Sequence, residues 1–153
     1  MSIEKAGMIW NIGKVIVLVF LLILSVIDSK TRLIPRKILW IWSALGIIYL
    51  MALWNCGKLD WLDTGMGVGT GVLFLGVSRI TDEAIGYADS VVIIILGGFL
   101  GFWKLAETLA GAFLISGICA IVLVSTRRIR TMPFLPFLTF GYLVVLAEQG
   151  GAL

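Results

Sequence analysis

The sequence contains no histidine and only two cysteines, Cys56 and Cys119, in 153 residues. Without histidine there can be no Ser-His catalytic pair. Two distant cysteines with no C-x-x-C spacing leave a zinc ion without a ligand set. These absences exclude triad hydrolases and the usual zinc sites, and we expect the two cysteines to be apolar filler and not a disulfide.

Charged residues are also scarce, at 14% of the chain, whereas a soluble domain carries about 25%. Hydrophobic residues make up 60% and the mean hydropathy is +1.09. The apolar residues come in runs long enough to cross a bilayer, which predicts an integral membrane protein. The net charge of +3 is too small to suggest nucleic acid as a partner.

Six apolar runs predict an all-α bundle of six transmembrane helices, with residues 1–153 forming a single transmembrane domain. The expected spans cover about residues 8–27, 38–54, 61–77, 84 or 89 to 103, 105–126 and 133–147. The first run ends in Asp28 and not in a small-x-small site, so we expect it to be kept as a helix and not cleaved as a signal peptide.

The basic residues indicate the orientation of these spans. Most of the 12 Lys and Arg residues follow the first, third and fifth spans: Lys30, Arg32, Arg36, Lys37, Arg79, Arg127, Arg128 and Arg130. The remaining ones fall on the opposite side: Lys5, Lys14, Lys58 and Lys104. The positive-inside rule then puts the richer loops in the cytoplasm and both termini on the non-cytoplasmic side.

The third predicted span is rich in glycine. Gly65/Gly69 and Gly67/Gly71 form two small-x-x-x-small pairs, a spacing that lets helix backbones approach closely. We expect a helix packed inside the bundle, with a loose or broken helix as the alternative, and an interfacial Asp63 near its start. Glycines spaced for similar close packing recur in the fourth span: Gly97, Gly98 and Gly101.

Two acids lie at the ends of apolar runs. Asp28 follows the first run and Asp89 opens the fourth, so both fall at the cytoplasmic face of the predicted topology. An acid at membrane depth is costly and calls for a functional explanation. Two neighbouring carboxyls share a proton and can activate a water molecule, which is the chemistry of aspartic proteases. Asp28 and Asp89 are therefore the candidate catalytic pair of a hydrolase.

Each acid also has a structural interpretation. Asp28 could pair with Lys30 or Arg32, and Asp89 could cap its own helix. If they form a pair, Asp28 lies at a helix C-terminus and Asp89 at a helix N-terminus. Because a helix N-terminus favours negative charge, the shared proton is expected mainly on Asp28.

Three sequence blocks carry a resemblance to a known family. They are Asp28-Ser-Lys-Thr-Arg-Leu-Ile34-Pro35, the block Gly86-Tyr87-Ala88-Asp89 followed by an apolar run to Gly97-Gly98-Phe99-Leu100-Gly101, and Met132-Pro133-Phe134-Leu135-Pro136-Phe137. In order and spacing they resemble the type IV prepilin peptidase family, the bacterial relatives of the GxGD intramembrane aspartic proteases. The resemblance covers nearly the whole chain.

The resemblance implies an aspartic endopeptidase with Asp28 and Asp89 as its catalytic pair. Such an enzyme sits in the bacterial cytoplasmic (inner) membrane and removes the basic leader of prepilins or pseudopilins just before their apolar helix. The expected partners are that signal segment and the bilayer, with no cofactor and no metal. Asp82 and Glu83 would suit the basic leader, although a solvated loop face is the favoured interpretation of these two acids. Gly86 would shape the turn that aims Asp89.

The chain departs from the family pattern at two positions. Ala88 stands where the second glycine usually stands, and alanine would cost about 1 kcal/mol or more if that position needs a positive φ. Arg36 stands where an asparagine often follows Ile-Pro. The chain also lacks the cysteine-bearing insert of the bifunctional members, so we expect a peptidase without methyltransferase activity.

The alternative is a non-catalytic polytopic membrane protein. It could be a degenerate peptidase retained in an assembly, or a carrier whose acids relay protons. A carrier predicts acids near the middle of the membrane and often an inverted repeat. Here the acids lie at one face and the sequence shows no repeat.

Overall fold

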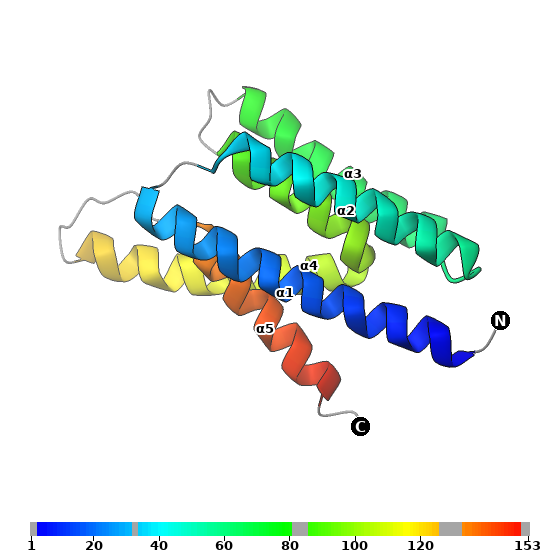
Figure 1. Ribbon diagram of the computed structural model, residues 1–153. Coiled ribbons are helices and arrows are strands. Elements are labelled where there is room, and N and C mark those ends of the chain that lie inside the picture. The colour runs from blue at the N-terminus through cyan, green and yellow to red at the C-terminus, as the bar shows by residue number, and fades with distance from the viewer. Residues whose placement is uncertain (1–2, 32–33, 81–85, 126–132, 151–153) are drawn as a thin grey trace.

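The computed structural model describes residues 3–31, 34–80, 86–125 and 133–150, and these residues contain helices and no strand (Figure 1). The all-α prediction is thereby confirmed. The helices are α1 (Ile3–Thr31), α2 (Arg36–Asn55), α3 (Trp61–Ile80), α4 (Tyr87–Ser125) and α5 (Leu135–Gly150).

Helix α4 is the centre of the bundle and contacts each of the other four helices. Its interior contains one non-helical residue, Gly101, with φ 75° and ψ 178°. Figure 1 shows the later, yellow part of α4 turning away from the direction of its first part. The fourth and fifth predicted spans therefore correspond to two helical parts of α4 that meet at a kink at Gly101, three residues before the turn expected at Lys104.

The break in α4 is held by a carboxylate from α3. The Oδ1 atom of Asp63 accepts the backbone N–H of Phe102 at 3.0 Å and that of Trp103 at 3.4 Å. The part of α4 after Gly101 therefore begins like a new helix, with an acid at its N-terminus as helix caps favour. Asp63, which we expected to be only interfacial, fixes the path of α4.

Two glycines of α3 allow its backbone to lie against α4. A Cβ atom added at Gly67 would come within 2.7 Å of the Gly97 carbonyl oxygen, and one added at Gly71 within 2.5 Å of the Ile94 nitrogen. These neighbours are backbone atoms, which cannot move aside as a side-chain end can. The predicted close packing of the Gly67/Gly71 pair is confirmed.

The other glycine pair of α3 has no such role. A Cβ atom at Gly65 or Gly69 would meet nothing within 4 Å. That face of the helix is exposed, as Leu62 and Leu73 show with exposed fractions of 78% and 72%. The expectation that α3 lies inside the bundle is wrong, because only one of its faces packs against α4.

Helix α5 is fastened to α1 along its length. The Thr139 hydroxyl donates to the Leu21 carbonyl at 3.3 Å, and the Tyr142 hydroxyl donates to the Lys14 carbonyl at 3.1 Å. The two helices therefore run antiparallel. They share a core with α4, in which fully buried side chains include Leu21, Leu24, Leu96, Leu105, Leu138 and Tyr142.

Among the residues that the structure describes, three helical stretches are long and apolar enough to cross a membrane: Gly7–Thr31, Arg36–Asn55 and Tyr87–Leu123. A shorter apolar helix covers Leu135–Glu148. Large apolar side chains cover the outer faces of these helices, as expected for a surface that lies in lipid. The prediction of a membrane protein is supported, whereas the number of six spans and the side of the termini stay predictions.

Candidate active site

Asp28 lies in the last turn of α1 and is 8% exposed. Its Oδ2 atom accepts the backbone N–H of Leu135 at 3.3 Å. Leu135 is the first residue of α5, so the N-terminus of α5 points at the Asp28 carboxylate. A helix N-terminus has unsatisfied N–H groups and a partial positive charge, and both favour a carboxylate there.

The sequence explains why α5 begins at this place. The Phe134 carbonyl accepts the N–H groups of Phe137 at 3.0 Å and Leu138 at 3.1 Å, which closes the first turn. Pro136 has no N–H and its ring suits a first helical turn. The N–H of Leu135 is thereby left for Asp28. Sequence reasoning found this Pro-Phe-x-Pro-Phe block but missed its contact with the acid.

Asp89 is the third residue of α4 and is half-buried. The carbonyl of Gly86 accepts the N–H of Ser90 at 3.2 Å, so Gly86 occupies the position just before the helix. A Cβ atom on Gly86 would lie 3.1 Å from Oδ2 of Asp89. A side chain at this position would crowd the carboxylate, which accords with the predicted role of Gly86 in aiming it.

The structure brings the two acids together. Asp28 and Asp89 come from different helices, and the charge of Asp28 acts on the Asp89 carboxyl group. One structural interpretation was that Asp89 caps its own helix. Asp89 lies inside α4, so it is not the N-cap residue of that helix. Lys30, another suggested partner of Asp28, is exposed, and Arg32 lies outside the described residues.

The position of α5 changes the argument about the shared proton. From α1 and α4 alone, the proton is expected on Asp28 because α1 ends there. Since the N-terminus of α5 also faces Asp28, both acids lie beside a helix N-terminus. The helix ends therefore no longer distinguish the two carboxyls, and the assignment stays an untested prediction.

Ala88 has a helical backbone conformation, since Gly101 is the non-helical residue of α4. It is half-buried and packs against the core. Alanine is the most favourable residue in a helix, so it carries no cost at this position. The condition under which Ala88 would impair the site, a positive φ, is not met.

A groove lies between the first turns of α2 and α4, with a volume of about 450 Å³. Its lining residues are Arg36, Leu39, Trp40, Ser43, Tyr87 and Val91. Tyr87 and Val91 flank Asp89 in sequence but point to the other side of α4, because successive helical residues turn by about 100°. Arg36, the second departure from the family pattern, is thus a residue of this groove and not of the acid pair.

Two of the predicted site residues, Asp82 and Glu83, lie outside the described residues. Within the ranges that the structure describes, no group of three or more His, Cys, Asp or Glu side chains could hold a metal ion. These ranges contain a pair of carboxyls at the ends of two apolar helices, and a largely apolar groove on the other side of α4.

The chain is similar to known proteins over most of its length. The model of the type IV leader peptidase family matches residues 15–125. A protein of Escherichia coli (strain K12) named prepilin leader peptidase/N-methyltransferase is 34% identical over 137 residues, which cover 83% of this chain and 59% of that protein. A protein of the same name from Pectobacterium carotovorum subsp. carotovorum is 30% identical over 149 residues, covering 89% and 50%.

The chain therefore spans between half and three fifths of the length of these two relatives. No solved structure matches it.

Proposed function

This chain belongs to the type IV leader peptidase family, and from that premise we propose that it is a membrane-embedded aspartic endopeptidase for prepilin-like substrates. Asp28 and Asp89 are its catalytic pair. The observation that carries the proposal is a buried Asp28 that is hydrogen-bonded to the N-terminus of α5 and whose charge acts on Asp89 at the start of α4.

In the proposed mechanism the pair shares one proton and holds a water molecule. The protonated carboxyl gives its proton to the carbonyl oxygen of the scissile bond, while the carboxylate takes a proton from the attacking water. The tetrahedral intermediate collapses as the newly protonated acid gives its proton to the leaving nitrogen, the other carboxylate takes a proton back from a hydroxyl of the intermediate, and the C–N bond breaks. The products are a leader with a new carboxyl end and a mature chain with a new amine.

The proposal includes the membrane topology. The distribution of basic residues puts the acid pair at the cytoplasmic face of the bacterial inner membrane and both termini on the other side. Six crossings would require the two parts of α4 on either side of Gly101 to act as separate spans. The break at Gly101 and the Asp63 cap support this reading.

The substrate would be a basic leader followed by an apolar helix. We place the apolar segment against the groove between α2 and α4, which begins within one turn of Asp89 and has apolar walls at Leu39, Trp40 and Val91. The basic leader would lie near Asp82 and Glu83, whose charge is complementary to it. Exchanging these two acids for Asn and Gln should slow cleavage of a basic leader more than that of a leader with glutamines.

The decisive experiment is cleavage of a co-expressed prepilin-like substrate by the wild type, Asp28→Asn and Asp89→Asn. The control is Asp60→Asn, which changes an exposed acid that caps α3 far from the pair. We expect cleavage by the wild type and the control, and none by the two pair variants. A pair variant that cuts at the control rate would refute the catalytic assignment.

The same experiment tests the non-catalytic alternative and the methyltransferase prediction. A wild type that reaches the membrane but cuts none of several prepilin-like substrates would favour a degenerate peptidase or a carrier. The mass of the new N-terminus answers the second question. We expect an unmodified amine, and a mass increase of one methyl group would refute the prediction of a peptidase without methyltransferase activity.

A further inference from the structure

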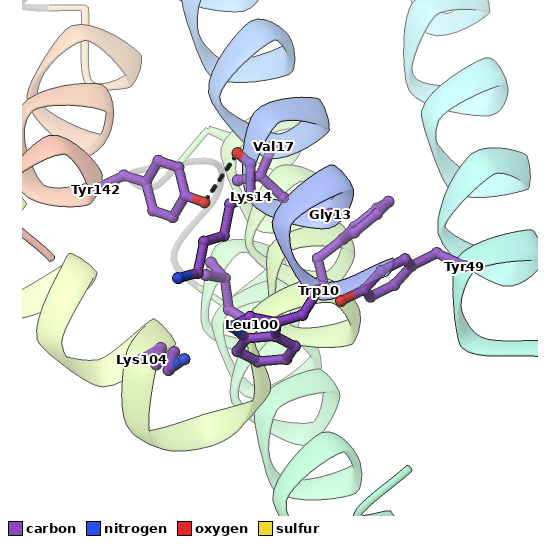
Figure 2. Close-up of a pocket in the computed structure, with 9 residues that line it drawn as sticks. Trp10, Gly13, Lys14, Val17, Tyr49, Leu100, Lys104 and Tyr142 are labelled. Atoms are coloured by element: carbon purple, nitrogen blue, oxygen red, sulfur yellow. Dashed lines mark hydrogen bonds between the residues drawn. The ribbon is translucent and has the colours of Figure 1, made fainter. Parts of the chain in front are cut away.

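At the end of the bundle opposite Asp28, two lysines from different helices meet beside a small pocket (Figure 2). Lys14 belongs to α1 and Lys104 follows the break in α4. The pocket is lined by these lysines together with Trp10, Tyr49, Leu100 and Tyr142. The acid pair lies two heptads further along α1, so this pocket is separate from the candidate active site.

The two ammonium groups share one space. Figure 2 shows both lysine side chains in the gap between α1, α4 and α5, with Trp10 beside them. The Lys104 nitrogen lies 4.0 Å from the centroid of the Trp10 ring, a cation–π contact that fixes its position. The charges of Lys14 and Lys104 act on each other. Two cations held this close favour an anion between them.

Nearby carboxylates do not fill that role. The charges of Asp63 and Glu107 also act on Lys104. However, Asp63 is engaged with the N–H groups of Phe102 and Trp103. Glu107 is exposed and lies three residues after Lys104 on the same helix. None of the described residues that line the pocket is acidic.

The size of the pocket decides where an anion can bind. Its enclosed volume is about 10 Å³, roughly the room for one water molecule. A phosphate group is larger, so it must sit at the mouth, where the lysine ends are. The apolar neighbours of the two lysines in sequence are exposed, Val15 after Lys14 to 60% and Trp103 before Lys104 to 69%. These surfaces suit acyl chains that run alongside the helices.

We propose that Lys14 and Lys104 together hold the phosphate of an anionic phospholipid at this end of the bundle. Basic pockets between transmembrane helices recognise such head groups. Trp10 and the Tyr49 and Tyr142 side chains form the floor beneath it. The bound lipid brings α1 and α4 together by neutralising two cations that otherwise repel each other. This proposal depends on the helices lying in a membrane and is independent of any peptidase activity.

The test is native mass spectrometry and thermal unfolding of the purified protein in a neutral detergent. The added probes are phosphatidylglycerol, phosphatidylethanolamine or inorganic phosphate at equal concentrations. We expect one phosphatidylglycerol molecule to stay bound and to raise the melting temperature, with a smaller effect of phosphatidylethanolamine. If the two lipids bind equally and raise the melting temperature equally, the proposal is overturned. If inorganic phosphate raises the melting temperature as much as phosphatidylglycerol does, the site binds a free anion and not a lipid.

The matched variants are Lys14→Gln and Lys104→Gln, with Lys58→Gln as a control in the exposed α2–α3 loop. Each pocket variant should weaken phosphatidylglycerol binding about fivefold, and the control should not. Unchanged binding in both pocket variants would overturn the proposal. If the Gln variants do not fold, Lys14→Arg and Lys104→Arg decide the matter, because they keep the charge and should keep the preference for phosphatidylglycerol over phosphatidylethanolamine.

Discussion

The contact between α3 and α4 can be measured with two substitutions that differ by half a helical turn. Gly71→Ala adds a methyl group 2.5 Å from the Ile94 nitrogen and 2.6 Å from its Cα atom, whereas Gly69→Ala adds the same group in open space. Both exchange a glycine for an alanine in the same helix. The gain in helix propensity, about 1 kcal/mol, is therefore common to both and cancels in the comparison.

The expected difference follows from the geometry. To reach ordinary van der Waals distance from the new methyl group, the backbone of α4 has to move away from α3 by about 1 Å. Overpacking of this kind costs about 1–3 kcal/mol. We therefore expect Gly69→Ala to raise the free energy of unfolding by up to about 1 kcal/mol, and Gly71→Ala to lie about 1–3 kcal/mol below it.

The assay is unfolding of the purified protein by titration with sodium dodecyl sulfate in mixed micelles, followed by tryptophan fluorescence and helicity. Cleavage of a prepilin-like substrate is a second readout, since Ile94 and Asp89 are on the same part of α4. We expect cleavage to fall in Gly71→Ala and not in Gly69→Ala. Equal stability of the two variants, within about 0.5 kcal/mol, would refute the close approach of α3 and α4.

Three further substitutions test single contacts. Asp63→Ala should lower the free energy of unfolding by about 1–2 kcal/mol, because it removes the acceptor of the Phe102 N–H. Asp63→Asn keeps an oxygen acceptor and should retain most of the wild-type stability. Equal losses of stability for the two variants in denaturant titrations would contradict the cap. Ala88→Gly should leave the cleavage rate nearly unchanged and cost about 1 kcal/mol of stability, whereas a large gain in cleavage would show that alanine impairs the site. Gly86→Ala should slow cleavage with little change in the melting temperature, because its methyl group would crowd the Asp89 carboxylate; an unchanged rate would show that the carboxylate has room to move.

The helical class and the membrane character could be predicted from the sequence, and the two acids stand out there as the candidate pair. These follow from local properties: run lengths, hydropathy and the cost of an acid at the end of an apolar run. The close packing at Gly67 and Gly71 was also predictable from its spacing. That Gly65 and Gly69 take no part was not, because the same spacing occurs on both faces of α3 and only the position of α4 distinguishes them.

Contacts between distant segments account for what sequence reasoning missed. Asp63 was recognised as an acid near a helix start, but its partners are on α4, and spacing along α3 carries no trace of them. The lysines at positions 14 and 104 were counted for orientation only, because their meeting depends on how α1 packs against the second part of α4. The contact of α5 with Asp28 also joins distant segments, and the assignment of the shared proton to Asp28 stays a prediction.

The hydrogen bond from Leu135 to Asp28 has a consequence for genetics. Its donor is a main-chain amide, which every residue except proline provides. An alanine scan of the chain would leave it intact and would not reveal that α5 takes part in holding the acid. Only a change of the main chain itself, such as an amide-to-ester exchange at Leu135, removes the donor and keeps the side chain. Tolerance of substitutions at this position would thus hide a contact on which the orientation of Asp28 depends.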